Sequence, residues 1–192
     1  HISRENREAA AYFMENGGLF TVATGRSKAG MEHFFPELSI NAPAILYNGS
    51  VIYDFNRKAD VLNTCVGETG FSLCTALEKR FPQIGIEVYA DHTPYVAQDS
   101  FWTRRHFQNV KMPWNFCPAE QIPQPWLSLV LTGESDDLPE VAAFLEEAFS
   151  NQFFVQFSSP HMLEIMHPEA NKGSAARHLW ERMGIRAENV YV

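Results

Sequence analysis

The stretch that decides the fold is Phe20-Thr21-Val22-Ala23-Thr24-Gly25-Arg26. Residues 19–23 form a short, nearly continuous apolar run, which is typical of a parallel strand buried on both faces. At the end of that run Thr24 offers a hydroxyl and a backbone N–H, and Gly25 lets the backbone approach a ligand without a side chain in the way. Ligands of open α/β sheets bind at the carboxyl ends of the strands, so this stretch predicts an α/β fold with a binding loop at residues 24–26.

The flanking sequence agrees with an α/β beginning. Ser3 can cap a helix that runs to about Asn16, where Gly17-Gly18 would end it. A second buried strand is expected at residues 44–47, and Asn48-Gly49 then gives the strongest short-range signal for a hairpin turn. Residues 50–54 would form the return strand.

Cations occupy helix starts where the peptide dipoles disfavour them. Arg26 and Lys28 open one expected helix and Lys172 opens another, at a cost of about 0.3–1 kcal/mol when exposed. An anion held between the two starts would remove the repulsion and accept their free N–H groups. The simpler alternatives are a solvent-exposed lysine, ordinary turn geometry at Gly25 and a plain hairpin turn at Asn48-Gly49.

The middle of the chain has a different pattern, in which a helix followed by a hairpin occurs twice. The first repeat consists of a helix at 69–81 and strands at 84–90 and 95–98. The second consists of a strand at 127–132, a helix beginning near Asp136-Asp137 and strands at 153–158 and 162–166. This order predicts an antiparallel sheet with helices on one face. We therefore expect an α+β domain at 63–166 inserted into an α/β domain made of 1–62 and 167–192.

The composition limits which classes of binding partner are expected. The net charge of −8 and the lack of a Lys/Arg cluster argue against a nucleic-acid-binding surface. No apolar run reaches the roughly 18 residues of a membrane span. The three cysteines show no Cys-x-x-Cys spacing, so neither a disulfide framework nor a zinc site is indicated. We expect a cytoplasmic protein without nucleic-acid or membrane partners, and the oligomeric state stays open.

Taken together, these segments resemble successive motifs of Cof-type haloacid dehalogenase-like phosphatases. The segments that carry the resemblance are Val22–Arg26, Ala44–Ser50, Leu163–Ile165 and Asn171–Gly173. The resemblance implies a Rossmann-like parallel-sheet core, incomplete in this chain, with an inserted α+β cap domain. It also implies that the Thr24 hydroxyl holds the transferring phosphoryl group and that Lys172 neutralises its charge. The residues expected to line the same cleft are Gly25, Arg26, Asn48 and Gly49.

The chemistry implied by the resemblance is phosphoryl transfer to an aspartate, followed by hydrolysis of the aspartyl-phosphate, with Mg²⁺ offsetting the charge. No Asp in this sequence has the Asp-x-Asp-Gly or Gly-Asp context of the nucleophile and the metal ligands, so none of these residues is assigned to the metal. We expect those aspartates outside residues 1–192 and no turnover by these residues alone. The complete protein is expected to hydrolyse a small phosphorylated metabolite such as a sugar phosphate.

Two alternatives remain open. A non-catalytic phosphate- or nucleotide-binding protein would use the same helix starts without the carboxylates, and magnesium-dependent release of phosphate would argue against it. A phosphomutase or phosphotransferase of the same superfamily would pass the group to a sugar hydroxyl instead of water, which analysis of the products would reveal.

Overall fold

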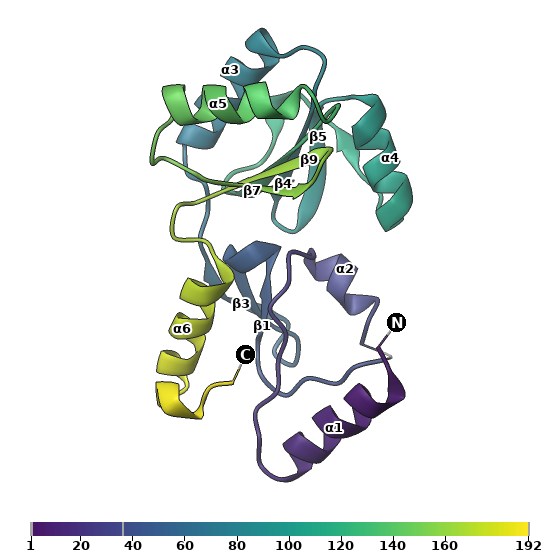
Figure 1. Ribbon diagram of the computed structural model, residues 1–192, viewed down its shortest axis with the longest axis vertical. Coiled ribbons are helices and arrows are strands. Elements are labelled where there is room, and N and C mark those ends of the chain that lie inside the picture. Colours follow the sequence, from purple (N-terminus) through teal and green to yellow (C-terminus); the bar gives the residue numbers. More distant parts are fainter. Residues whose placement is uncertain (1, 36, 192) are drawn as a thin grey trace. The chain divides into compact units, whose positions relative to one another are not determined.

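The computed structural model describes residues 2–35 and 37–191, and the chain divides into two compact units (Figure 1). The first unit combines the residues up to Asn63 with those from Asn171 onward, and the second runs from Thr64 to Ala170. The sequence had placed the two boundaries after residues 62 and 166. No helix within the described residues is long and apolar enough to cross a bilayer.

The first unit begins with two capped helices. Helix α1 (Arg4–Glu15) starts as expected at Ser3, whose side chain accepts a hydrogen bond from the Asn6 N–H at 3.2 Å. Helix α2 (Lys28–Glu32) is capped in the same way by Ser27, which accepts from the Gly30 N–H at 3.1 Å. The second cap places Arg26 before the helix instead of inside its first turn.

A three-stranded antiparallel sheet follows, in the order β1 (Ala44–Leu46), β2 (Val51–Asp54) and β3 (Ala59–Asn63). Helix α6 (Lys172–Arg182) packs against the first two strands. The buried residues of this contact are Ile45, Ile52, Ala175 and Leu179. The core of the first unit thus joins a segment near residue 50 to one near residue 175. A short 3₁₀ turn, Ala187–Asn189, follows α6.

The expected buried strand at residues 19–23 is wrong in detail. This segment runs parallel to β1, but only one bridge forms, between Ala23 and Ile45. Leu19 is 47% exposed and Ala23 is exposed as well. A central parallel strand has a neighbour at each edge and is buried by helices on both faces of its sheet. Among the described residues only β1 pairs with this segment. The parallel pairing of the first unit is therefore limited to this bridge.

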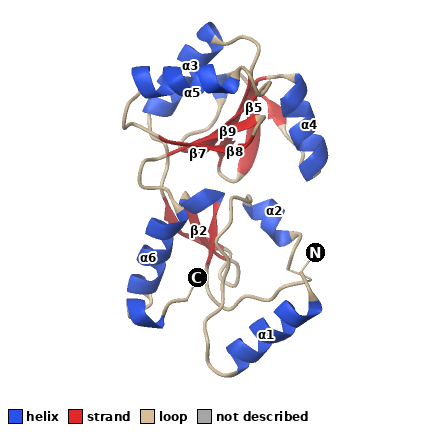
Figure 2. Cartoon of the chain, viewed as in Figure 1, coloured by secondary structure: helices blue, strands red, loops and turns tan. Residues whose placement is uncertain are grey.

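The second unit contains a six-stranded sheet in the order β6-β5-β4-β7-β9-β8, shown by the red strands in the upper part of Figure 2. All pairs are antiparallel except β5 with β6. The strands are β4 (Gly85–Ala90), β5 (Thr93–Gln98), β6 (Asn115–Phe116), β7 (Trp126–Thr132), β8 (Phe154–Ser159) and β9 (Met162–Met166). Its helices are α3 (Thr69–Arg80), α4 (Phe101–Val110) and α5 (Leu138–Ala148). The expected repeat of a helix followed by a hairpin is confirmed.

The helices lie on both faces of this sheet, whereas the sequence predicted one. Alternate side chains of the central strands, such as Ile86 and Val88, join α3 and α5 in one buried apolar cluster. The intervening Glu87 points to the opposite face and meets His106 of α4. Because side chains alternate along a strand, α4 covers the second face.

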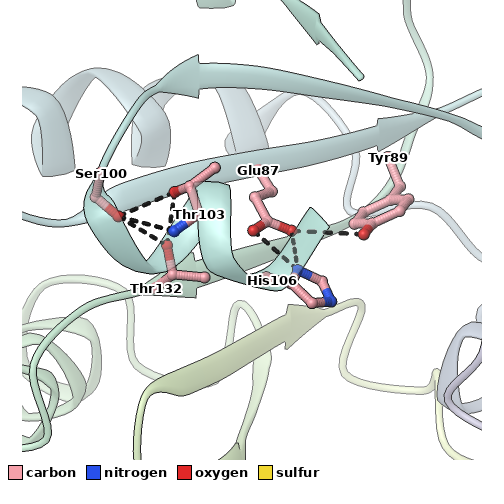
Figure 3. Close-up of polar contacts among 6 residues, drawn as sticks. All are labelled: Glu87, Tyr89, Ser100, Thr103, His106 and Thr132. Carbon is pink, nitrogen blue, oxygen red and sulfur yellow. Dashed lines mark hydrogen bonds and ion pairs between the residues drawn. The ribbon is translucent and has the colours of Figure 1, made fainter. Parts of the chain in front are cut away.

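Three hydroxyl groups pin the start of α4 to the sheet. The side-chain oxygens of Ser100, Thr103 and Thr132 lie 2.7–3.2 Å from one another (Figure 3). They gather over Gly85, where a Cβ atom would lie 2.7 Å from the Ser100 hydroxyl and closer still to the two threonines. Only glycine leaves room for this cluster, which fixes the first turn of α4 against β4 and β7.

Candidate anion-binding site

The loop at residues 24–26 is held by backbone hydrogen bonds to β1 and to the turn that follows it. The Thr24 N–H donates to the Ile45 carbonyl at 2.9 Å, and the Thr24 carbonyl accepts from the Asn48 N–H at 3.0 Å. The Tyr47 N–H donates to the Arg26 carbonyl at 3.1 Å. These bonds place the first sequence motif directly beside the second.

The hydroxyl of the half-exposed Thr24 already accepts one hydrogen bond within the loop. Its oxygen accepts from the Arg26 N–H at 3.2 Å, which shapes the tight turn at Gly25. An oxygen that accepts in this way still carries a proton to donate, so the hydroxyl can serve an anion outside the loop.

Gly25 is needed for close packing as well as for the turn. A Cβ atom there would lie 2.9 Å from Asn48 Nδ2 and 3.0 Å from Asn48 Oδ1. Asn48 is 6% exposed and has a φ of +54°, a left-handed conformation that asparagine tolerates better than most residues. The buried amide of Asn48 therefore lies against the backbone of the predicted binding loop.

Gly49 brings the far end of the chain to the same place. Its φ is +113°, and a Cβ atom would lie 2.9 Å from Asn171 N and closer still to the Asn171 carbonyl. The turn after β1 thus packs backbone to backbone against the residue that caps α6. Leu46 pairs with Val51, so the connection between β1 and β2 has four residues, 47–50. The two-residue hairpin turn expected at Asn48-Gly49 is therefore wrong. Within this longer connection, Asn48 and Gly49 make the contact with Asn171 possible.

The start of α6 has the form of an anion site. Asn171 accepts from the Ser174 N–H at 2.8 Å, so the third amide of the helix is satisfied by the cap. The amides of Lys172 and Gly173 precede it and have no carbonyl within the helix to bond. Lys172 is exposed, and the first turn contains no acidic residue. The first turn of α6, where the helix dipole is positive, therefore offers two amides that lack a partner within the helix, and the exposed Lys172 belongs to the same turn.

The other two cations contribute less than the sequence suggested. The Lys28 ammonium lies 3.9 Å from Glu32 Oε1 and 5.0 Å from the centre of the Tyr53 ring, so its charge is already offset within the unit. The Arg26 guanidinium stacks over Phe34 at 4.4 Å and is exposed. The Phe34 ring thus holds the Arg26 guanidinium beside the loop. Lys28 does not need an anion to offset its charge, so it no longer supports an anion site.

Sequence reasoning missed Tyr47, which organises the turn. It has a φ of +47°, an unusual and strained conformation for a bulky residue. Its hydroxyl accepts from the Lys28 N–H at 3.3 Å, so one buried side chain links the turn to the start of α2. Burial raises the pKa of the Tyr47 phenol, which keeps it neutral at ordinary pH. Three successive residues with positive φ, of which Tyr47 is the first, are not visible in a sequence pattern.

The described residues do not provide a magnesium site. Within residues 2–35 and 37–191 no three His, Cys, Asp or Glu side chains are grouped so that they could hold a metal ion. Asp54, the acidic residue at the end of β2, accepts from the N–H groups of Asn56 and Arg57 at 2.9 and 3.0 Å and so caps a turn.

A family model described as haloacid dehalogenase-like hydrolase matches residues 1–192. This chain belongs to that family. The HMP-PP phosphatase of Citrobacter koseri is 24% identical over 192 residues, which cover 96% of this chain and 68% of that protein. The expected resemblance to haloacid dehalogenase-like hydrolases is confirmed.

Solved structures share the fold. The crystal structure of TM0651 from Thermotoga maritima matches with a TM-score of 0.82 at 22% identity, covering 98% of this chain and 71% of that one. A haloacid dehalogenase-like hydrolase from Bacteroides thetaiotaomicron matches with a TM-score of 0.81 at 20% identity, covering 99% of this chain and 73% of that one. The expected fold class, an α/β haloacid dehalogenase-type core with an inserted α+β domain, is confirmed.

Proposed function

We propose that the protein is a magnesium-dependent phosphatase of the Cof type that hydrolyses a small phosphorylated metabolite such as a sugar phosphate. The observation that carries the proposal is the contact between Gly49 and Asn171, because it holds the start of α6 beside the turn that packs on Thr24 and Gly25. Family membership and the phosphatase name of a relative support the reaction class.

In this proposal the described residues bind the phosphoryl group and stabilise its charge. The Thr24 hydroxyl and the first amides of α6 donate hydrogen bonds to the phosphoryl oxygens, and Lys172 neutralises the charge that develops during transfer. Gly25, Arg26, Asn48 and Gly49 line the cleft. The attacking aspartate and the ligands of Mg²⁺ are assigned to residues outside 1–192.

The second unit is proposed to be the cap domain that selects the substrate. It corresponds to the α+β insertion expected from the sequence at residues 63–166. We further propose a cytoplasmic protein whose partner is the phosphorylated metabolite, with neither nucleic acid nor membrane involved.

The test is hydrolysis of a panel of phosphorylated metabolites by the full-length protein with Mg²⁺, measured as released phosphate. Lys172→Ala is expected to lower kcat by about 10²–10³-fold, the size of effect seen when one preorganised charge-stabilising group is removed. Lys58→Ala, which removes an exposed lysine in the β2–β3 turn, is the matched control and should leave kcat unchanged.

Retained turnover in Lys172→Ala would remove this lysine from the site. Phosphate binding without hydrolysis of any compound would indicate a non-catalytic phosphate-binding protein. Transfer of the phosphoryl group to a second sugar hydroxyl, seen in the products, would indicate a phosphomutase or phosphotransferase.

A further inference from the structure

A buried pair of acid and imidazole joins α4 to the sheet of the second unit. The Glu87 side chain on β4 has no exposed surface, and its two carboxylate oxygens lie 3.0 and 2.9 Å from His106 Nδ1 (Figure 3). The Tyr89 hydroxyl makes a long hydrogen bond of 3.5 Å to the same carboxylate. His106 is thus held through Nδ1, while its other ring nitrogen points away from the carboxylate (Figure 3).

The two halves of α4 are attached to the sheet by different chemistry. Near the start of the helix, Thr103 belongs to the hydroxyl cluster with Ser100 and Thr132, and hydroxyl groups do not titrate near neutral pH. One turn later the polar attachment is His106, the side chain type whose charge changes between about pH 5 and 8. The C-terminal half of α4 is therefore attached through a contact whose charge depends on protonation.

A buried aromatic side chain and an open surface hollow lie at this C-terminal half. Phe107 is 3% exposed and stacks on Trp114, with ring centres 5.7 Å apart. A surface cavity of about 390 Å³ opens beside the pair. Its lining residues are Arg104, Phe107, Gln108, Met112 and Trp114. Phe107 is therefore the buried apolar anchor of this half, next to the polar attachment at His106.

The charges that face His106 are mostly acidic. Glu87 comes from β4 and Glu164 from β9. Glu164 pairs with Val130 of the neighbouring strand β7. The residues that β5 and β7 place opposite Glu87, Val96 and Val130, are uncharged. Tyr89 adds a phenol from β4.

On α4 itself the charges lie away from the pair. Arg104 is engaged by Asp99, with its Nε 2.8 Å from the carboxylate, and Arg105 is exposed. His161, from the β8–β9 turn, stacks on Trp102 with ring centres 3.5 Å apart and so lies against the first turn of α4. Within residues 2–35 and 37–191, His106 is thus the cation that lies against Glu87.

Both members of the pair hold protons more tightly than usual. Burial disfavours the charged imidazolium, but the hydrogen bond to Glu87 and the charges of Glu87 and Glu164 outweigh burial and raise the pKa of His106. Burial also raises the pKa of Glu87, although the hydrogen bond with His106 partly offsets it. Loss of the imidazolium proton leaves Glu87 as a buried carboxylate with no positive partner, which is unfavourable.

We propose that His106 is a protonation switch that holds residues 105–114, the C-terminal half of α4 and the turn after it, on the sheet of the second unit. With His106 protonated the segment is closed. When the proton leaves, the segment opens about the hydroxyl cluster, which keeps the first turn of α4 in place. This device is independent of the proposed phosphatase activity.

The test is amide hydrogen exchange of the full chain by NMR, expressed as protection factors between about pH 6 and pH 9. Protection of residues 105–110 is expected to fall by up to tenfold per pH unit, the limit for release of one proton, as pH rises toward the titration midpoint of His106 in the folded chain, and to level off above it. Protection of α5 should stay constant. The His106 midpoint itself is read from the imidazole resonances of the same sample.

Three variants make the result specific. His106→Gln should leave the protection of residues 105–110 low and independent of pH. Glu87→Gln, which removes the buried carboxylate, should abolish the fall of protection with pH. The control His178→Gln, at an exposed position on α6, should keep the wild-type profile.

Protection that stays constant from pH 6 to 9, or that falls with the same midpoint in His106→Gln, would overturn the proposal. If His106→Gln does not fold, the wild-type data decide. A loss of protection that continues above the midpoint of the His106 resonances would contradict the switch.

Discussion

Replacing Gly49 by alanine probes the contact on which the candidate site depends. The residue has a φ of +113°, and a side chain in the left-handed region costs about 1–2 kcal/mol. The added Cβ would also press on the backbone of Asn171, 2.9 Å from its nitrogen and nearer to its carbonyl. Overpacking of this kind costs about 1–3 kcal/mol. We expect the free energy of unfolding of the first unit to fall by about 2–5 kcal/mol.

Gly184→Ala is the control because Gly184 also has a positive φ but lacks the contact. Gly184 follows α6 with a φ of +69°, and nothing lies within 4 Å of an added Cβ. This variant should therefore lose only the conformational cost of about 1–2 kcal/mol. The difference between the two variants, about 1–3 kcal/mol, measures the close approach of the turn to α6.

The assay is urea unfolding followed by ¹⁹F NMR of protein labelled with fluorotryptophan. Trp180 lies on α6, and the other three of the four tryptophans lie between Thr64 and Ala170, so its signal reports the first unit alone. Equal losses in Gly49→Ala and Gly184→Ala, within about 0.5 kcal/mol, would refute the contact between Gly49 and Asn171.

Three further outcomes follow from the same contacts. Gly85→Ala would place a Cβ inside the hydroxyl cluster, so the second unit should lose about 3 kcal/mol or more in urea unfolding, and a loss below 1 kcal/mol would contradict the cluster. Thr24→Val should weaken binding of inorganic phosphate by about 1–3 kcal/mol in calorimetry, and unchanged affinity would exclude its hydroxyl. The pKa values of His106 and Glu87 are raised in the folded chain, so the folded chain binds more protons than the unfolded chain. This difference begins as pH rises past the ordinary pKa of each group, about 4.5 for the carboxyl and about 6.5 for the imidazole. The free energy of unfolding of the second unit should therefore be greatest below these pH values and decrease as pH rises. The Glu87→Gln/His106→Gln double variant should lose this dependence on pH. Urea unfolding midpoints measured at a series of pH values check both statements.

Local signals in the sequence predicted much of this structure. Helix α6 begins at Lys172 because Asn171 is a good cap, and α3 and α5 appear where apolar residues recur at helical spacing. The candidate site residues were chosen because they lie at the ends of elements and match motifs of the family that the sequence resembles, and their roles stay predictions. Their contacts, such as that of Gly49 with Asn171, depend on tertiary packing and could be found only in the structure.

The failures have a common physical cause, which is that strand pairing and buried polar pairs are not local. Residues 19–23 have the composition of a buried strand, yet only β1 pairs with them among the described residues. Strand β3 was not expected, since its residues 59–63 are mostly exposed and its order comes from backbone pairing with β2. Glu87 and His106 are 19 positions apart, and no pattern in either segment predicts that they meet.

Titration of this chain with inorganic phosphate, followed by the amide resonances of a ¹⁵N-labelled sample, tests most directly whether the two motifs form one anion site. The account predicts saturable shifts at Gly25, Arg26, Lys172 and Gly173 that share a single dissociation constant. Lys172→Ala should raise that constant by about tenfold or more, as expected for loss of a charged hydrogen bond. Shifts confined to one of the two segments, or a constant unchanged by Lys172→Ala, would contradict it.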